Sequence, residues 1–165
     1  MPLKQTIQED LKASMREGNS VKTGALRMLL ASLAEKQRGK REAAWKADKS
    51  ASEEVLQAKS VLTDEEAQIV VMSEVKKRKE AAFEFEKGGR KDLSEKELQE
   101  AGILQKYLPP QLSDEEIRTI VKEVMQEVGA QGVQDKGKLM AALMPRVRGK
   151  TEGSRVNAIV QELLS

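Results

Sequence analysis

The chain has 165 residues and a formal net charge of +2, and 34% of its residues are charged while only 2% are aromatic. It contains no cysteine and no histidine, which excludes disulfides, Cys/His zinc sites, cysteine nucleophiles and histidine-dependent catalytic triads. With so few aromatic residues the core has to consist of Leu, Ile, Val, Met and Ala, which favours packed helices over sheets.

Membrane and export signals are missing from the sequence. No segment is long and apolar enough to span a bilayer, and the first residues lack the apolar run of a signal peptide. The sequence therefore predicts a cytoplasmic protein that does not enter a membrane.

The first predicted helix covers residues 3–17, because Leu3, Ile7, Leu11 and Met15 recur every four residues and share a face. Gly18 ends it. A second helix begins near Val21 after a cap at Asn19 or Ser20, and its apolar stripe consists of Leu26, Leu29, Leu30 and Leu33.

The stripe of the second helix fades over residues 35–49, which are mostly charged residues and alanine. A helix that is polar all round projects into solvent or meets a partner. Trp45, the only tryptophan, could stack on a base or anchor a partner, although packing against the next long helix is the commoner role. The second helix is thus a candidate surface for a protein partner.

Residues 48–62 have little pattern and are predicted to form a flexible connector or a short, poorly packed helix. Thr63 and Glu66 then form a capping box, which opens a helix that Gly88–Gly89 ends; its stripe contains Val71, Val75, Ala82 and Phe85. Ser94 and Glu97 predict another capping box, and the helix after it carries Leu98, Ala101 and Leu104 or Leu108.

Four consecutive basic residues, Lys76 to Lys79, lie inside the helix that begins at Thr63. On a helix four neighbours spread around the cylinder and cannot form one face. With Glu74 and Glu80 beside them, they are interpreted as a solvated surface rather than a nucleic-acid patch.

Pro109–Pro110 cannot continue a helix and predicts a boundary between domains 1–108 and 113–165. Ser113 and Glu116 form a third capping box, before the clearest amphipathic stripe of the chain, and Gly129 ends this helix. Two further helices are marked by Leu139, Met140, Leu143 and Met144, halted by Pro145, and by Val156, Ile159, Val160, Leu163 and Leu164. No segment alternates like a strand, so the predicted fold is all-α, with a helical N-terminal domain and a small three-helix C-terminal domain.

The C-terminal domain is polarised in charge. Residues 108–128 hold two basic and five acidic side chains, whereas residues 129–165 hold six basic and three acidic ones. The basic part surrounds a glycine-containing turn at the start of the last helix, where free backbone N–H groups favour an anion. The candidate RNA-binding residues are Lys138, Arg146, Arg148, Gly149, Lys150, Gly153, Arg155 and Asn157. The alternative is a solvated turn between helices, in which Asn157 only holds the preceding loop.

Other chemical sites find little support in the sequence. Gly149-Lys150-Thr151 resembles the end of a nucleotide-binding P-loop, but Met144 stands where that motif needs a glycine. The acidic trios 64–66 and 114–116 open helices and are interpreted as caps rather than metal ligands. No serine or lysine lies in a nucleophile motif, so the sequence predicts no catalytic residues, no metal and no cofactor.

Several segments resemble the YqeY family over nearly the whole chain. They are residues 3–10 with 26–29, residues 85–93, the hinge from Tyr107 to Leu112, and the spacing of Gly137, Met140, Met144, Gly149, Gly153 and Asn157. That last spacing is similar to the tail domain of the B subunit of tRNA-dependent amidotransferases. Residues 48–62 look like an insertion relative to the family pattern.

The resemblance implies a helical N-terminal domain and a three-helix tail that contacts tRNA. It also implies the family-level label of carbon–nitrogen ligase activity with glutamine as amido-N-donor, although the kinase and amidase parts of such a reaction are absent from this chain. The leading hypothesis is a tRNA-interacting accessory protein. Two alternatives are a helical protein–protein interaction adaptor without RNA binding and an enzyme that acts with missing subunits.

Overall fold

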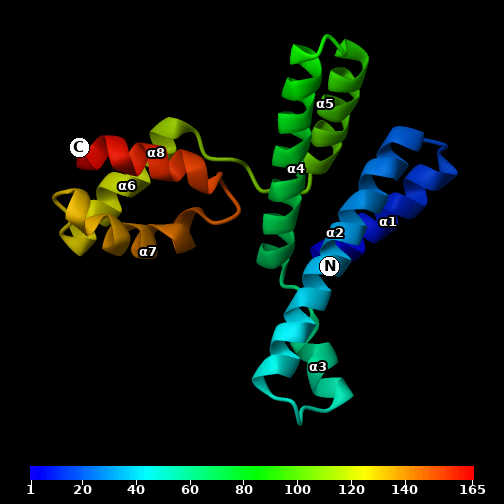
Figure 1. Ribbon diagram of the computed structural model, residues 1–165, viewed down its shortest axis with the longest axis horizontal. Coiled ribbons are helices and arrows are strands. Elements are labelled where there is room, and N and C mark those ends of the chain that lie inside the picture. The colour runs from blue at the N-terminus through cyan, green and yellow to red at the C-terminus, as the bar shows by residue number, and fades with distance from the viewer. The chain divides into compact units, whose positions relative to one another are not determined.

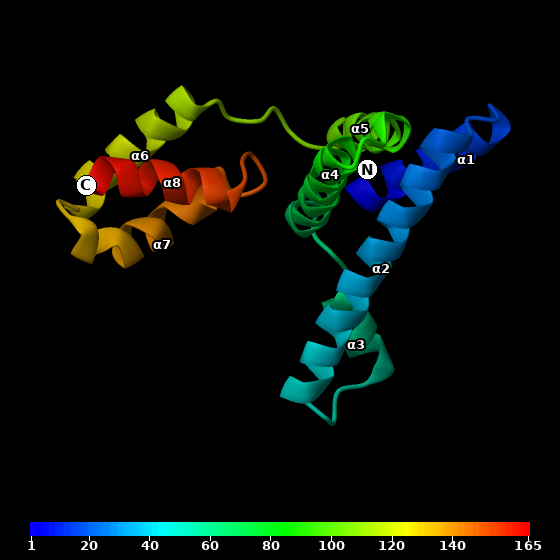
Figure 2. The ribbon, with the colours of Figure 1, turned by 45° about the horizontal axis from the view of Figure 1, so that its top comes forward.

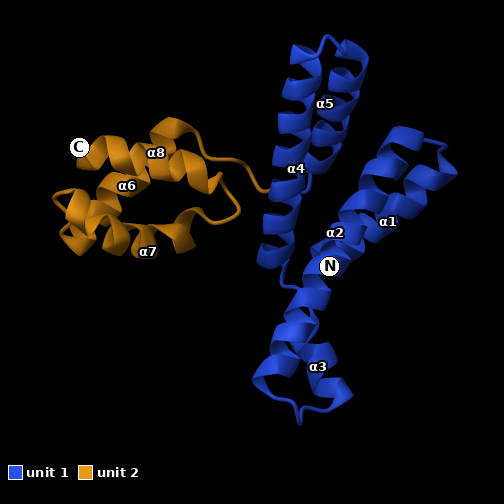
Figure 3. Cartoon of the chain, in the orientation of Figure 1, with its two compact units in different colours: residues 1–107 blue, residues 108–165 orange.

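The computed structural model describes residues 1–165, and all its regular elements are helices, which confirms the predicted all-α fold class (Figure 1). Contacts divide the chain into two compact units, Met1–Tyr107 and Leu108–Ser165, which Figure 3 colours separately. No helix combines the length and apolar character needed to cross a membrane.

Two helical hairpins and one short helix make up unit 1. Its helices are α1 (Leu3–Arg16), α2 (Ser20–Ala47), α3 (Glu53–Ser60), α4 (Asp64–Lys87) and α5 (Lys91–Gln105). Helix α1 lies along the first half of α2, and α4 lies along α5, as Figures 1 and 2 show. At 1.5 Å per residue α2 is about 42 Å long and α1 about 21 Å, so the second half of α2 extends beyond α1. The largest fully buried side chains of unit 1 are Ile7, Leu26, Leu29, Leu33, Val71 and Leu104.

Local caps define the helix starts that the sequence predicts best. The side chain of Asn19 accepts a hydrogen bond from the backbone of Lys22 at the start of α2. Thr63 and Glu66 form the predicted capping box of α4. The interpretation of the trio 64–66 as a helix start is therefore confirmed, since Glu66 bonds to the backbone N–H of Thr63.

Residues 48–62 contain a short helix, α3, so the short helix of the second predicted alternative is present, but the expectation that it is poorly packed is wrong. The Ser52 side chain caps it by accepting a hydrogen bond from Val55. Leu56 is buried, and α3 packs on α2. Trp45 is 46% exposed and borders a shallow hollow with Leu56. The expectation that Trp45 packs against α4 is thus wrong, because α3 occupies the flank of α2 at this point.

Helix α5 begins earlier than predicted. Gly88–Gly89 ends α4 as expected, and α5 starts at Lys91. The backbone N–H of Ser94 donates to the carbonyl oxygen of Arg90, so Ser94 lies in the first turn and is not the N-cap. The predicted capping box of Ser94 with Glu97 is therefore wrong. The turn at the two glycines is tight, so α5 begins almost directly after α4 ends.

Two predicted core residues, Met15 and Leu98, point outward and are 52% and 51% exposed. A four-residue repeat rotates by about 40° per step around a helix of 3.6 residues per turn, so Met15 has turned away from the face of Ile7. Ser14 takes its place, buried against α2, with its hydroxyl 3.0 Å from that of Thr23. On α5 the buried face holds Ser94, Ala101 and Leu104 instead of Leu98.

The basic run of α4 contains a buried ion cluster that joins α4 to α5. Arg78 is 4% exposed, and its guanidinium donates to Glu74 at 2.8 Å and to Glu100 at 3.2 Å. The interpretation of the whole run as a solvated surface is therefore wrong for Arg78. Burial alone would raise the pKa of the Glu74 carboxyl, but hydrogen bonds from Lys77, Arg78 and Ser32 hold that pKa below its ordinary value.

The end of unit 1 is fastened to its first helix. The Tyr107 hydroxyl donates a hydrogen bond to the carboxylate of Asp10 at 2.5 Å. Burial raises the pKa of the Tyr107 phenol, and the bond to Asp10 raises it further. Tyr107 therefore remains a neutral donor, and α1 is tied to the chain just before the proline hinge.

Unit 2 is a three-helix unit of α6 (Asp114–Val128), α7 (Lys136–Val147) and α8 (Gly153–Leu164), with the 3-10 turn η1 (Val133–Asp135) before α7. The predicted capping box of Ser113 and Glu116 is present, and Gly129 ends α6 with a φ of 67°, a left-handed conformation that favours glycine. The core is formed by Ile117, Val121, Val124, Leu139, Leu143 and Val156, with others around them.

Pro145 does not halt α7 as predicted, because the helix continues to Val147. A proline inside a helix removes one hydrogen bond. Val147 is 1% exposed and belongs to the core of unit 2, so its burial offsets that loss. The end of α7 therefore leads directly into the basic, glycine-containing turn before α8.

We expect limited proteolysis of the native chain to cut first near residues 48–52 or 109–113, which lie outside helices. A protease needs an extended backbone, and neither segment is part of a helix. The measurement is mass spectrometry of early fragments. Protection of 109–113 after cuts inside α6 or α7 would show that residues 108–165 do not form an independently stable domain.

Candidate nucleic-acid interface

The turn between α7 and α8 has a fixed backbone. The N–H of Leu112 donates to the carbonyl oxygen of Lys150 at 2.8 Å, and the side-chain amide of Gln111 donates to that of Gly149 at 3.2 Å. Gly149 is buried and has a φ of 75°, a conformation that a residue with a Cβ rarely adopts. The segment after the proline hinge thus holds the backbone of the α7–α8 turn through these two hydrogen bonds. The positive φ of Gly149 allows the chain to bend there.

Two cations on this turn are free. The side chains of Arg148 and Lys150 are exposed and have neither an ion-pair nor a hydrogen-bond partner. They flank Gly149 in the sequence. Because the backbone of Gly149 is held in place, the points from which the two side chains extend are held in place too. They are therefore the residues of the predicted set that are available to an anionic ligand.

Two other predicted cations are paired within unit 2. Arg146 contacts Glu127 of α6 at 2.6 Å. The guanidinium of Arg155 contacts Asp114 at 2.5 Å and the carbonyl oxygen of Leu112 at 3.5 Å. Arg155 consequently fastens α8 to the start of α6. Both pairs are exposed, so their stabilising effect is small, and their charges are partly neutralised.

Lys138 and Asn157 have different surroundings. The ammonium of Lys138 donates to the carbonyl oxygen of Val128 at 2.7 Å and caps the end of α6. Eight residues separate Lys138 from Arg146 along α7, which corresponds to about 12 Å, so Lys138 does not join the turn. Asn157 is exposed on α8, and its amide makes no hydrogen bond with the preceding loop.

The start of α8 presents backbone donors. Glu152 precedes the helix without capping it through its side chain, and Gly153 is the first helical residue. A Cβ on Gly153 would meet no atom within 4 Å, so the space beside it is open. The N–H groups of Gly153 and Ser154 are orphan donors of the first turn, where the helix dipole also favours negative charge.

Two residues around the turn were missed by the sequence analysis. The side-chain amide of Gln111 donates to the carbonyl oxygens of Pro109 and Gly149, and its place in the Tyr107–Leu112 hinge does not reveal these contacts. Thr151 is 5% exposed, and its hydroxyl is buried without a hydrogen-bond partner. The bond from Gln111 helps to hold the backbone of the turn at Gly149.

These features define a class of two-unit helical protein whose C-terminal three-helix unit carries an exposed basic turn at a helix start. The family model for Yqey-like proteins matches residues 4–164, nearly the whole chain. This chain belongs to the YqeY family, and the family part of the resemblance is confirmed. No curated protein matches it significantly.

Proposed function

We propose that this protein is a tRNA-interacting accessory protein that binds through the basic turn of unit 2. The observation that carries the proposal is the pair of exposed, unpartnered cations, Arg148 and Lys150, on a backbone held by Gln111 and Leu112. Because the backbone is already fixed, binding has to order only the two side chains, and cations supply most of the affinity for nucleic acid.

The start of α8 supports the same ligand chemistry. Gly153 and Ser154, three and four residues after Lys150 in the sequence, offer N–H donors at the helix start, and a phosphate accepts from cations and from N–H groups. The likeness of this unit to the amidotransferase tail domain favours tRNA among RNAs. We propose that the protein acts by binding, and that any carbon–nitrogen ligase chemistry of the family label takes place on other subunits.

We expect replacement of both Arg148 and Lys150 by alanine to flatten the dependence of tRNA affinity on salt. Each lost phosphate contact reduces the slope of log K against log salt by roughly 0.7 to 0.9, so the double variant should lose roughly 1.4 to 1.8. The measurement is fluorescence anisotropy of labelled tRNA over a range of KCl concentrations.

The charge-matched control is Lys76→Ala with Lys77→Ala, which removes two exposed cations of α4 in unit 1. This control should leave the slope nearly unchanged. Arg146→Ala should have an intermediate effect, because Glu127 already neutralises that guanidinium. If the wild-type protein binds tRNA no better than a protein of equal charge at physiological salt, the proposal is wrong.

A further inference from the structure

One end of the buried Arg78 guanidinium faces a weak hydrogen-bond acceptor. The Nε and Nη1 groups of Arg78 donate to Glu100 at 3.2 Å and to Glu74 at 2.8 Å. The Nη2 group is directed instead at the sulfur of Met28 on α2, 3.8 Å away, and a thioether sulfur accepts only weakly. The guanidinium therefore bonds strongly within the α4–α5 hairpin and weakly to α2.

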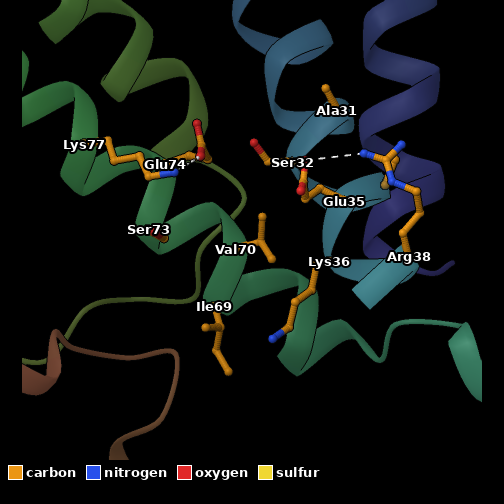
Figure 4. A pocket seen from close by; sticks show the side chains of 11 residues that line it. Ala31, Ser32, Glu35, Lys36, Arg38, Ile69, Val70, Ser73, Glu74 and Lys77 are labelled. Atoms are coloured by element: carbon orange, nitrogen blue, oxygen red, sulfur yellow. Dashed lines mark hydrogen bonds and ion pairs between the residues drawn. The ribbon is translucent and has the colours of Figure 1, made fainter. Parts of the chain in front are cut away.

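The contact between Met28 and Arg78 belongs to a junction between α2 and α4. Ser32 follows Met28 by about one helical turn, and its side chain donates a hydrogen bond to the Glu74 carboxylate. Figure 4 shows Ser32 and Glu74 directed toward each other from the two helices, where both line a shallow hollow of about 580 Å³. The ion cluster thus reaches α2 through Ser32 and through Met28, and the thioether of Met28 is the weaker acceptor.

The sulfur of Met28 belongs to an exposed side chain. Met28 is 58% exposed, whereas Arg78 is 4% exposed. Among the other methionines only Met1 and Met15 are exposed to a similar degree. Methionine in contact with solvent is open to oxidation to the sulfoxide. Met28 therefore combines a reactive, accessible sulfur with a buried charged donor.

Oxidation of Met28 by a peroxide replaces a weak acceptor by a strong one. The sulfur lone pair attacks one oxygen of hydrogen peroxide and the O–O bond breaks, so sulfur loses two electrons and the peroxide gains them. The proton on the transferred oxygen then joins the departing hydroxide, which gives water and the sulfoxide. The sulfoxide group is polar, and its oxygen accepts hydrogen bonds far better than the thioether sulfur does.

The distance between Met28 and Arg78 already suits a bond to a sulfoxide. An S–O bond of about 1.5 Å, an O···N distance of about 2.8 Å and an angle of about 120° at the oxygen place sulfur and nitrogen about 3.8 Å apart. The Met28 sulfur and the Nη2 nitrogen of Arg78 are 3.8 Å apart with the thioether in place. The added oxygen therefore reaches its donor without a shift of α2 or α4.

We propose that Met28 is a redox-modification site, at which a peroxide forms a sulfoxide that accepts a hydrogen bond from Arg78 and fastens α2 to the α4–α5 hairpin. Methionine oxidation disrupts cores because it makes an apolar side chain polar. Met28 is more than half exposed, so its oxygen keeps contact with water, while burial of the Arg78 donor strengthens the new bond. Oxidation therefore stabilises unit 1, and methionine sulfoxide reductase reverses the effect.

The test treats the full-length protein with dilute hydrogen peroxide and follows each methionine by peptide mass spectrometry. Met28 should be oxidised together with Met1 and Met15, before the less exposed methionines. Urea unfolding followed by Trp45 fluorescence should then give an equilibrium constant for unfolding at least roughly fivefold lower than before treatment. Treatment with methionine sulfoxide reductase should restore the original constant.

Met15→Leu is the matched control variant. The sulfur of Met15 also lies 3.8 Å from a guanidinium nitrogen, that of Arg27, but Arg27 is exposed. Peroxide should therefore stabilise Met15→Leu as it stabilises wild type, and it should not stabilise Met28→Leu. Without peroxide, Met28→Gln should have an unfolding constant at least roughly fivefold lower than that of Met28→Leu, because the glutamine side chain carries a carbonyl oxygen in place of the sulfoxide oxygen.

The proposal is overturned if Met28 stays reduced while Met15 is oxidised. It is also overturned if oxidation of Met28 leaves the stability of unit 1 unchanged or lowers it in the Met15→Leu background. If Met28→Leu gains as much stability from peroxide as wild type does, another methionine carries the effect and the proposal is wrong.

Discussion

Arg78→Ala is expected to lower the free energy of unfolding of unit 1 by about 3–5 kcal/mol, because it leaves buried carboxylates without their shared cation. Glu74 and Glu100 both contact the Arg78 guanidinium, and the three side chains are 5–11% exposed. Urea unfolding followed by the fluorescence of Trp45 measures this loss, since the only tryptophan lies in α2 of the same unit.

Lys77→Ala is the matched control for this prediction. Lys77 contacts the same carboxylate, Glu74, at 2.9 Å, but its side chain is 67% exposed. Exposed pairs contribute about 0–1 kcal/mol, so this variant should unfold almost like wild type. If Arg78→Ala costs no more than Lys77→Ala, the cluster is hydrated in solution and does not stabilise the unit.

The stabilities of the wild-type protein and of Arg78→Ala should depend on pH in different ways. The pKa of Glu74 is lowered in the folded state, by Lys77 and Arg78 against the opposing effect of burial. The contribution of Glu74 to folding stability is therefore present above the pKa of the carboxyl in the unfolded chain. It is lost as the pH falls through the pKa of the carboxyl in the folded protein. In Arg78→Ala a buried carboxyl favours its neutral form, so acid stabilises the variant relative to wild type and the difference between them shrinks.

Helix positions could be predicted from the sequence because their signals are local. The capping boxes of Thr63 and Ser113 and the glycine at 129 each act within a few residues. The failures occurred where tertiary packing decided the outcome. Pro145 remained helical because Val147 is buried beyond it. Met15 is a different case, because the rotation of a four-residue repeat follows from helix geometry alone, and it leaves Ser14 rather than Met15 against α2.

The ion cluster could not be predicted from the basic run alone. Arg78 is buried because Glu100 lies opposite it, 22 residues further along the chain. A four-residue run indicates charge density, but it carries no information about which member faces a neighbouring helix. Arg78 is therefore buried, unlike its neighbours in the basic run, because of the way α4 pairs with α5.

The candidate nucleic-acid interface could likewise be predicted from the sequence only in part. The sequence supplied the basic residues of the turn and the start of α8, whereas their availability depends on distant partners. Arg146 pairs with Glu127, 19 residues away, and Arg155 pairs with Asp114, 41 residues away. Only the fold distinguishes Arg148 and Lys150, which have no such partner.

Val121→Asp is expected to unfold unit 2. Val121 is fully buried in the core that α6 shares with α7 and α8, and no cation is part of that core. An unpaired carboxylate there costs on the order of several kcal/mol, against a total stability of roughly 3–9 kcal/mol for a unit of this size. The far-ultraviolet helical signal should fall, while the Trp45 fluorescence transition of unit 1 stays in place.

Thr119→Asp is the control, because it adds the same charge to an exposed position of α6. Its effect should be within about 0.5 kcal/mol. A helical signal unchanged by Val121→Asp would mean that α6 presents another face to the core. If the helical signal and the Trp45 transition both collapsed, the two units would unfold as one, and the boundary at Pro109–Pro110 would not separate independent domains.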